Sequence, residues 1–456
     1  MRCYGAFCLS AIAVLLLSPP NVAASGPVTL YVFPYTALLF APDGSMPDSS
    51  LVIGKNGVLY GTTEKGGPYG YGGLTPFNSF GSGTVFSLTP PESQGGAWTQ
   101  TVLWSFGGTP TDGEGPLGGV VIGPNGTLYG TAVSGGANGG GTVFSLKPPT
   151  SPGGAWTEAI LYSFGPSLVG STGGPNALVM DGHGVLYGTT LGGGDYDTCS
   201  GEFVNYCGGT VFSLTPPESG DGEWKETPLW SFGGFQGDGI GANNIAVGAN
   251  GVLYGTTAAG GQYYSVDPYG ALGTVFSLTP PATKGGAWTE NLLWSFGGAA
   301  SSGVWPNGVI VGSGGVLYGM TSSGLLGDVK GTVFSLSPPA SPGGAWREQD
   351  LHGFLFNHQN GGFAPYSNLV QGINGELYGT TFGGGAGYGI VFALKAPASA
   401  GASWSFAVLL GFLSSGAVNP VAGLVQGSNG VLYGTTAEGP QTEPYGTAGA
   451  VFALAP

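Results

Sequence analysis

The sequence predicts an all-β fold, a seven-bladed β-propeller built from four-stranded antiparallel blades. The first observation is a repeat: the tripeptide LYG occurs seven times, each time followed by a loop and then by GTVFSL or a close variant. The second is its spacing, which runs from 55 residues (Leu377 to Leu432) to 69 residues (Leu59 to Leu128). A unit of this length repeated in tandem indicates a ring or an array of like modules. The copies of LYG begin at Leu59, Leu128, Leu186, Leu253, Leu317, Leu377 and Leu432.

Each repeat divides into four strand-like pieces, as the second copy shows. Gly119–Ile122 is the first piece, and the turn Gly123–Gly126 joins it to the second, Thr127–Ala132. The Asn-Gly pair in that turn favours a tight hairpin. The third piece is Thr142–Lys147, closed by two prolines, and the fourth is Trp156–Phe164. Four antiparallel strands in each repeat describe a propeller blade.

The two ends of the chain predict how the ring closes. The last repeat stops at its third strand, Val451–Leu454, and the first is preceded by a surplus strand-like run, Thr29–Phe40. We expect this run to complete the seventh blade, with Leu38–Phe40 in the place that Leu103–Phe106 takes in the first. Closure removes the exposed sheet edges of an open array. An open solenoid of two-stranded coils is the alternative, but it gives no reason for a missing and a surplus strand to match.

Aromatic side chains recur at matched positions of the repeats: the tyrosine of LYG, the phenylalanine of GTVFSL and a tryptophan before the fourth strand. Packing between blades requires such recurrence, whereas a single binding site requires only one copy. We therefore interpret these aromatic residues as structural. The tryptophans are Trp98, Trp156, Trp224, Trp288, Trp346 and Trp404.

The whole pattern, SFGG…DG…P…LVxGxNGxLYGTTxxGG…GTVFSL, resembles the bacterial tandem repeat called the GloVer repeat. The resemblance covers essentially all of the chain after Ala24. It implies a propeller-like fold and export, and no established activity. Members often end in surface-anchoring or sorting tails, whereas this sequence stops at Pro456 directly after a strand. We therefore expect no attachment through such a tail.

The N-terminal segment Met1–Ala24 has the features of a secretory signal peptide. Arg2 supplies a positive start, Ala11–Leu17 an apolar run, and Val22–Ala24 a small-residue cleavage site. The apolar run is too short to span a membrane. We expect cleavage near Ala24, a secreted, periplasmic or extracellular location, and one propeller domain over residues 25–456. An uncleaved anchor is the alternative.

The cysteines predict a disulfide, and the net charge narrows the range of expected partners. Cys199 and Cys207 lie eight residues apart in one loop, which predicts a disulfide in an oxidising compartment. Without Arg2 the chain keeps 8 basic against 24 acidic residues, a formal charge near −16. Nucleic acids and anionic membranes need basic patches, so neither is an expected partner. We expect a monomer without a membrane span.

The loops predict where a ligand would bind. In propellers the loops from strand two to strand three, and from blade to blade, surround one end of the central channel. Three of them are long, namely Gly66–Gly83, Gly192–Gly209 and Ala259–Gly273. Aromatic rings beside carboxylates suit stacking on sugars and hydrogen bonds to hydroxyls. The alternative is that these side chains only bury the backbone of their own loops. The candidate ligand-binding residues are Tyr69, Tyr71, Asp195, Tyr196, Asp197, Tyr206, Tyr263, Tyr264 and Asp267.

Evidence for a metal or for catalysis is weak. Asp-Gly pairs at Asp43, Asp112 and Asp238, with Glu114 nearby, could supply oxygen ligands to calcium. No calcium-loop motif is present, however, and Asp-Gly is also a good turn. We assign no cofactor and no metal ligands. The sequence carries no Ser-His-Asp spacing, H-E-x-x-H, P-loop or dinucleotide fingerprint, so we assign no catalytic residue.

The function predicted from these observations is a binding or scaffold module for glycan or an extracellular protein. One alternative is a polysaccharide-degrading enzyme, which would need a pair of carboxylates across a cleft on the channel face. Asp112, Asp195, Asp197 and Asp238 could provide it. The other alternative is a purely structural protein of the cell envelope.

Overall fold

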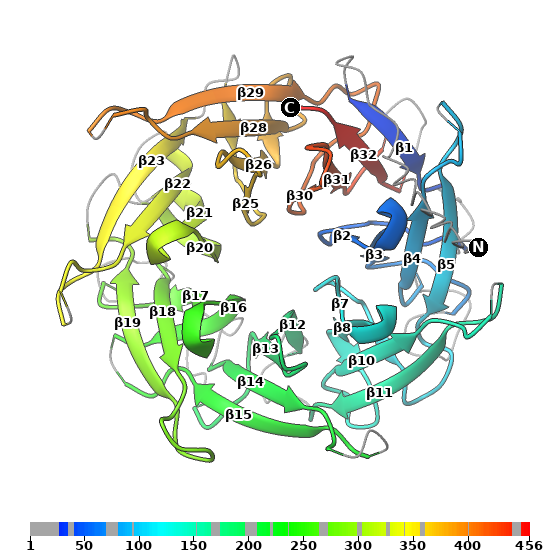
Figure 1. Ribbon diagram of the computed structural model, residues 1–456, viewed down its shortest axis with the longest axis horizontal. Helices are drawn as coiled ribbons and strands as arrows, with labels where there is room; N and C mark the ends of the chain where they lie inside the picture. Colours follow the sequence, from blue (N-terminus) through cyan, green and yellow to red (C-terminus); the bar gives the residue numbers. More distant parts are fainter. Residues whose placement is uncertain are drawn as a thin grey trace, which may run out of the picture.

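Seven four-stranded antiparallel sheets stand in a ring, like blades around a common axis (Figure 1). The fold is the predicted seven-bladed β-propeller. In this computed structural model the described residues are 27–34, 41–69, 81–93, 95–151, 153–165, 174–196, 208–218, 222–235, 237–263, 272–298, 303–324, 329–341, 343–355, 361–399, 401–439 and 448–456.

Each of the first four blades runs outward from an inner strand near the axis to an outer strand at the rim. Blade 1 contains β2 (Val52–Ile53), β3 (Leu59–Thr63), β4 (Thr84–Thr89) and β5 (Thr99–Ser105). Blade 2 contains β7 (Val120–Ile122), β8 (Leu128–Ala132), β10 (Thr142–Lys147) and β11 (Thr157–Ser163). Blade 3 contains β12 (Pro175–Met180), β13 (Leu186–Thr190), β14 (Thr210–Thr215) and β15 (Lys225–Ser231). Blade 4 contains β16 (Gly239–Val247), β17 (Leu253–Gly260), β18 (Thr274–Thr279) and β19 (Thr289–Ser295).

The remaining three blades follow the same order. Blade 5 contains β20 (Gly303–Val311), β21 (Leu317–Gly324), β22 (Val329–Ser337) and β23 (Arg347–Leu355). Blade 6 contains β25 (Val370–Gln371), β26 (Leu377–Thr381), β28 (Ile390–Lys395) and β29 (Ser405–Gly411). Blade 7 contains β30 (Val425–Gln426), β31 (Leu432–Thr436), β32 (Ala450–Leu454) and β1 (Val28–Val32). Two small ladders, β6 (Gly113–Glu114) with β9 (Ser134–Gly135) and β24 (Gly362–Phe363) with β27 (Gly383–Gly384), flank blades 2 and 6.

The strands of blade 2 agree closely with the prediction. The third strand has the bounds expected of it, and the others differ by one or two residues at their ends. The Asn-Gly turn between β7 and β8 forms because Asn125 takes φ 59° and Gly126 takes φ 78°. Asparagine and glycine tolerate this left-handed region better than other residues, so the turn chemistry fixes the hairpin.

The N-terminal strand closes the ring, as predicted, but with a different set of residues. β1 pairs antiparallel with β32, matching Val28 to Ala453 and Val32 to Ala450. The N–H of Phe33 donates to the carbonyl of Gly449 at 2.9 Å. The first blade uses Phe106 and Gly83 in the same way. Phe33 therefore takes the place that we expected for Phe40, because TLYVF, the earlier of two similar runs, supplies the strand.

Every junction between blades contains a pair of phenylalanines in ring contact, and all of them are buried except Phe164, which is half-buried. The ring that follows each outer strand lies against the GTVFSL ring of the next blade, with centroids 4.8 to 5.3 Å apart. Six of these contacts are edge-to-face and the seventh, Phe232–Phe276, is tilted, and such contacts add to the free energy of burial. The pair between blades 7 and 1 is Phe33 with Phe86, so the closing strand makes the same contact as the others. The remaining pairs are Phe106–Phe144, Phe164–Phe212, Phe232–Phe276, Phe296–Phe334, Phe354–Phe392 and Phe412–Phe452.

A second aromatic contact joins blades at the end with the Asn-Gly turns. At six junctions the tyrosine of LYG packs on the tryptophan of the next blade, with centroids 5.7 to 6.2 Å apart. This supports the interpretation of both residues as structural. The pairs are Tyr60–Trp156, Tyr129–Trp224, Tyr187–Trp288, Tyr254–Trp346, Tyr318–Trp404 and Tyr433–Trp98.

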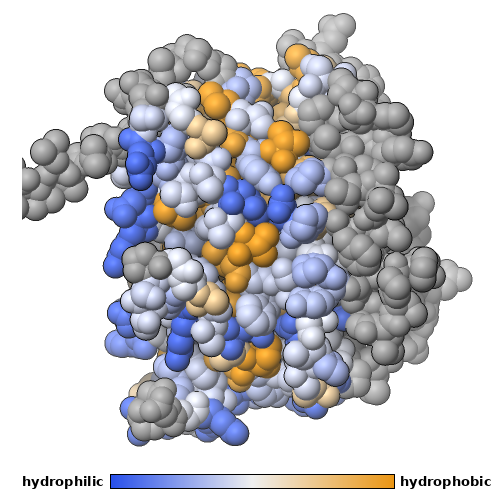
Figure 2. Space-filling view, turned by 90° about the vertical axis from the view of Figure 1, so that its right-hand side faces the viewer, coloured by the Kyte–Doolittle hydropathy of each residue, from blue (hydrophilic) through white to orange (hydrophobic). Residues whose placement is uncertain are grey.

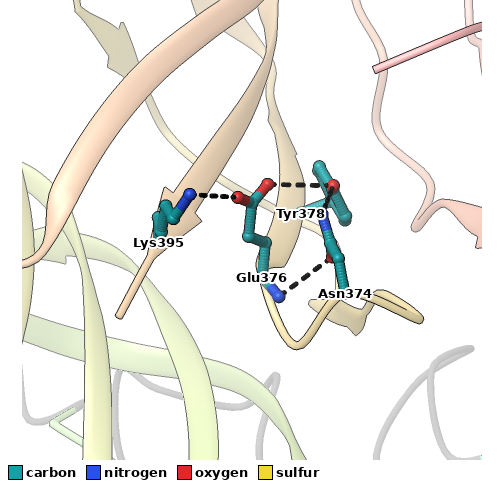
Figure 3. Close-up of polar contacts among 4 residues, drawn as sticks. All are labelled: Asn374, Glu376, Tyr378 and Lys395. Carbon is teal, nitrogen blue, oxygen red and sulfur yellow. Dashed lines mark hydrogen bonds and ion pairs between the residues drawn. The ribbon is translucent and has the colours of Figure 1, made fainter. Parts of the chain in front are cut away.

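In blade 6 the tyrosine at this position makes polar contacts within its own blade (Figure 3). The outer strand of blade 7 is β1, and among the described residues no tryptophan ring contacts Tyr378. The Tyr378 hydroxyl instead donates to Glu376 at 3.1 Å and accepts from the amide of Asn374 at 2.8 Å. Lys395 lies 3.7 Å from the other oxygen of Glu376. These contacts satisfy a tyrosine hydroxyl whose residue is only 1% exposed.

The outer rim is mixed in character. Figure 2 shows apolar side chains there as separate patches between polar ones. Along β5 and β11 exposed and half-buried positions alternate over the first four residues, and the remaining residues are half-buried. In the described residues no helix is long and apolar enough to cross a membrane.

Candidate functional site

Three of the predicted tyrosines occupy one equivalent position in three different blades. Tyr69, Tyr196 and Tyr263 each lie over the second glycine of the SFGG turn, namely Gly108, Gly234 and Gly298. Tyr69 and Tyr196 are 44% and 46% exposed. Tyr263 packs against the core that contains Phe296 and Val275. The position is thus a repeated packing device, and it leaves Tyr69 and Tyr196 able to contact a ligand.

Several predicted residues lie outside the described part of the chain. Their placement, the disulfide and their part in any ligand site stay predictions. These residues are Tyr71, Asp197, Tyr206, Tyr264, Asp267, Cys199 and Cys207.

Asp195 and Tyr196 border a cavity of about 280 Å³ at the outer end of blade 3, which we call the rim cavity. Its wall continues through Trp230 at the end of β15 and through Phe235 in the loop to blade 4. Phe235 is 55% exposed. The remaining lining residues are Pro228, Leu229, Ser231, Gly234 and Asp238. Three aromatic rings and an exposed carboxylate therefore meet around one opening.

Trp230 and Phe235 were not among the predicted site residues. Trp230 belongs to the repeated LWSF segment, and it was not considered in the sequence analysis. Phe235 stands in the segment GGFQGDG, downstream of Trp230. Trp104 and Trp294 are the equivalent tryptophans of blades 1 and 4, and neither is followed by an aromatic residue at the same distance. An aromatic residue in a turn that is otherwise glycine-rich is the signal that could have identified it.

A second cavity lies on the axis of the ring, and we call it the central well. It has a volume of about 260 Å³ and receives residues from all seven blades. Its wall is mostly amides, hydroxyls and backbone. In blades 3, 4 and 5 these groups come from the inner strands themselves, and in the other blades from the segments just before the inner strands. The lining residues are Asp48, Ser49, Ser50, Leu117, Gly118, Asn176, Ala177, Asn243, Asn244, Asn307, Tyr366, Ser367, Asn368, Val421, Ala422 and Gly423.

Hydrogen bonds between neighbouring blades hold the wall of the central well. The hydroxyl of Thr62 donates to the carbonyl of Pro116 at 2.7 Å, and that of Thr131 donates to Asn176 at 2.8 Å. Thr435 of blade 7 donates to the carbonyl of Ser49 in blade 1 at 3.2 Å, so these contacts also cross the closing junction. The wall is therefore preorganised by the ring itself.

Acidic residues of the blade-to-blade loops stabilise backbone turns by accepting hydrogen bonds from N–H groups. One carboxylate oxygen of Asp238 accepts the N–H groups of Gly233 and Gly234, and the other accepts that of Gly239. Asp112 accepts those of Gly108 and Gly113 in the same way. In the described residues no group of three or more His, Cys, Asp or Glu is placed to hold a metal ion. Of the carboxylates considered for calcium, those of Asp112 and Asp238 thus have backbone partners, and that of Asp43 accepts from the hydroxyl of Tyr31 at 3.1 Å.

Carboxyl pairs lie near the outer strands. Burial raises the pKa of Glu158 in β11 to about 8, and the charge of Asp112 adds to the shift. Burial, with the charge of Asp238, raises the pKa of Glu290 in β19 to about 7. Burial and Asp350 raise the pKa of Glu348 in β23 to about 8. These glutamates stand on the outermost strands of their blades, away from the channel face where an enzymatic pair was considered.

These shifts predict that stability decreases with rising pH. The folded chain keeps protons on Glu158, Glu290 and Glu348 that the unfolded chain releases above about pH 4.5, so the free energy of unfolding falls between about pH 4.5 and about pH 8. We expect on the order of 1 kcal/mol from each carboxyl after solvent screening. His352, whose pKa burial lowers, works in the opposite direction over the lower part of this range.

Urea unfolding at several pH values measures this dependence. Glu158→Gln should flatten the decline, because a neutral amide has no proton to lose. Glu92→Gln, a change at an exposed residue, should leave the slope as it is. A midpoint that is constant or rises across the range would show that these carboxyls are not held protonated.

Solved structures with a similar backbone share little sequence with this chain. A gluconolactonase from Xanthomonas campestris is 12% identical, with 73% of this chain and 82% of that chain covered and a TM-score of 0.37. The PQQ-bound aldose sugar dehydrogenase from Streptomyces coelicolor is 12% identical, with 74% and 92% covered and a TM-score of 0.43. PorZ, a surface component of the type-IX secretion system of Porphyromonas gingivalis, is 14% identical, with 84% and 44% covered and a TM-score of 0.42. These values carry no argument about substrate or partner.

The comparison by sequence is more specific. The family model described as the Gloeobacter/Verrucomicrobia repeat matches residues 28–266 and, overlapping them, residues 195–452. The two matches together span almost all of the described propeller. A comparison with curated proteins found no significant match.

Proposed function

Because the chain belongs to the Gloeobacter/Verrucomicrobia repeat family, we propose that it is an exported propeller that binds glycan at the rim cavity. The main observation in support is that Tyr196, Trp230 and Phe235 line one cavity of about 280 Å³. This size is close to the lower end of small-molecule pockets, about 300 Å³. Aromatic faces of this kind stack on the apolar faces of sugar rings.

The charge and polarity of the rim cavity favour a neutral ligand. No Lys, Arg or His is among its lining residues, so it offers no cation to a phosphate or carboxylate. The exposed carboxylate of Asp195 supplies hydrogen-bond acceptors for hydroxyls beside the Tyr196 ring. The carboxylate of Asp238 has backbone partners and contributes to the shape of the wall. A polyhydroxylated, uncharged ligand fits this combination.

A glycan array with residues 25–456 tests the proposal, run once with calcium and once with a chelator. We expect selective binding, and for any glycan found we expect Tyr196→Ala and Phe235→Ala each to weaken affinity about tenfold, since each removes a stacking face. Tyr69→Ala is the matched control, because Tyr69 lies on Gly108 as Tyr196 lies on Gly234 but does not border the cavity.

Two results would contradict the proposal. The first is a blank array with protein that unfolds cooperatively, which would favour a protein partner or a structural role. The second is binding that Tyr196→Ala and Phe235→Ala leave at wild-type affinity, which would place the glycan elsewhere. If binding occurs with calcium and is lost with the chelator, the acidic loops would bind calcium as part of the site.

A further inference from the structure

Three neighbouring blades supply the central well with amides that are oriented by contacts between blades. The side-chain nitrogen of Asn176 donates to the carbonyl of Asn243 at 3.1 Å, and that of Asn243 donates to Pro306 at 2.9 Å. The side-chain nitrogen of Asn307 donates to the carbonyl of Pro365. A primary amide has two N–H donors and an oxygen acceptor, so each of these side chains keeps an N–H and an oxygen beyond its bridging bond. Blades 3, 4 and 5 therefore present three oriented groups that donate and accept, which we call the amide row (Asn176, Asn243 and Asn307).

Exposed apolar surface stands at both ends of the amide row. Leu117 of blade 2 precedes the row around the ring and is 38% exposed, and Tyr366 of blade 6 follows it and is 51% exposed. The Tyr366 ring packs on the Phe382 ring, with centroids 5.7 Å apart and an interplanar angle of 62°. This contact limits the orientations that the ring can take. The well thus combines hydrogen-bonding groups with an oriented aromatic surface.

A hydroxyl lines the well on the side opposite the amide row. Ser50 of blade 1 is exposed, and its oxygen accepts the N–H of Gly423 at 3.0 Å. A hydroxyl has one hydrogen to donate besides its acceptor oxygen, so Ser50 keeps that hydrogen for a ligand. Both sides of the well therefore offer donors as well as acceptors.

The lining favours an uncharged ligand. Among the described residues that line the well there is no Lys, Arg or His, and Asp48 is the one acidic residue. An anion would meet no counter-charge there and would be repelled by Asp48. A cation would leave the N–H groups of the amide row without acceptors, and donors left unmatched on binding reduce affinity. A ligand whose own groups both donate and accept fits every part of this lining.

We infer that the central well is a second saccharide site, which takes one terminal pyranose ring of a neutral sugar between the amide row and Tyr366. Each hydroxyl of such a ring donates and accepts, as the amides do, and its C–H face packs on an aromatic side chain. A volume of about 260 Å³ is near the lower end for small-molecule pockets and suits a single ring. Because all seven blades line the well, a saccharide chain must enter it by one end. The inference goes beyond the proposed rim cavity, and neither site requires the other.

Saturation-transfer NMR with the methyl glycosides of glucose, galactose and mannose tests this site. The protein is residues 25–456 with Tyr196→Ala and Phe235→Ala, in which the rim cavity has lost two of its stacking faces. We expect at least one of the three glycosides to bind with a Kd in the millimolar range or below. The uronate that corresponds to this sugar should bind at least about tenfold more weakly, because its carboxylate has no counter-charge in the well.

Two further substitutions identify the well as the place of binding. Tyr366→Ala and Asn243→Ala should each weaken binding of the glycoside about tenfold, through loss of the aromatic surface and of an amide respectively. Asn243→Ala also removes the bond to Pro306, so its unfolding midpoint is measured as well. Tyr366→Ala removes an exposed ring and keeps the test valid if Asn243→Ala unfolds. Tyr69→Ala is the matched control, because Tyr69 is 44% exposed and borders neither cavity.

Three results would overturn the inference. The first is no saturation transfer to any of the three glycosides from protein that unfolds cooperatively. The second is equal affinity for a glycoside and its uronate, which would contradict a site for neutral sugars. The third is unchanged affinity in both Tyr366→Ala and Asn243→Ala, which would place the sugar elsewhere. Binding by the wild type that Tyr196→Ala with Phe235→Ala abolishes would support the rim cavity and leave the well without a sugar.

Discussion

Replacing Phe33 by alanine should lower the free energy of unfolding by about 3 to 5 kcal/mol. The Phe33 ring is fully buried and lies 5.1 Å from the Phe86 ring, where it completes the junction between blades 7 and 1. Removing it leaves a cavity at the junction that the closing strand completes, and β1 joins the rest of blade 7 only through its pairing with β32. Urea unfolding followed by tryptophan fluorescence measures the loss.

Two comparison variants identify the cause. Phe232→Ala removes the same kind of ring from the junction between blades 3 and 4, and should cost a similar free energy. Hydrogen exchange should distinguish the two, because only Phe33→Ala should release the amides of β1 and β32. Val28→Ala, at a residue 41% exposed, should change stability by at most about 0.5 kcal/mol. Wild-type exchange of β1 in Phe33→Ala would show that the ring contact does not hold the closure.

Replacing Gly255 by alanine should destabilise the protein by about 1 to 3 kcal/mol although it adds only one methyl group. A Cβ on Gly255, the glycine of LYG in blade 4, would overlap the Phe276 ring and lie 2.6 Å from the backbone oxygen of Asn244. The ring could move only into the junction with Phe232, and the backbone oxygen belongs to the inner strand. Thermal or urea unfolding measures the effect.

Gly182→Ala is the matched control for this prediction. Gly182 lies in the hairpin turn of blade 3, and a Cβ there meets nothing within 4 Å. The change should be neutral or stabilising by up to about 1 kcal/mol, because alanine restricts the unfolded chain. The double variant Gly255→Ala with Phe276→Leu should recover part of the loss. Equal stability of Gly255→Ala and Gly182→Ala would show that the close approach to Phe276 is not what requires glycine.

The blades could be predicted from the sequence because the residues that pack them together recur in seven repeats. Gly255 with Phe276, and Tyr254 with Trp346, stand for contacts that most or all of the blades make. Repetition alone could not decide the closing strand, because Thr29–Phe40 contains two similar apolar runs. A tertiary contact selects the closing strand: one phenylalanine must bond to the carbonyl of Gly449 and pack on the Phe86 ring, and Phe33 does so.

The candidate sites were harder to predict because they depend on positions where the repeats differ. The central well is lined by one equivalent position of each repeat, directly after a position that holds proline in six repeats and Ala242 in blade 4. No motif marks the well, because the residue at this position differs between repeats: it is Asp48, Leu117, Asn176, Asn243, Asn307, Tyr366 or Val421. The ring brings these seven positions together, although about sixty residues separate neighbours in the chain. At the rim cavity, Asp195 and Tyr196 stood out by composition, whereas Trp230 was concealed by its own repetition.

The pairing of β1 with β32 also sets an order of events during synthesis. β1 is made among the first strands and β32 among the last of the described chain, so β1 has no partner until six blades exist. During this interval both ends of the open arc expose unpaired backbone groups and the pocket for the Phe33 ring. Two arcs that meet at high concentration can therefore exchange closing strands and form a domain-swapped pair. Dilution during refolding should favour the closed single ring.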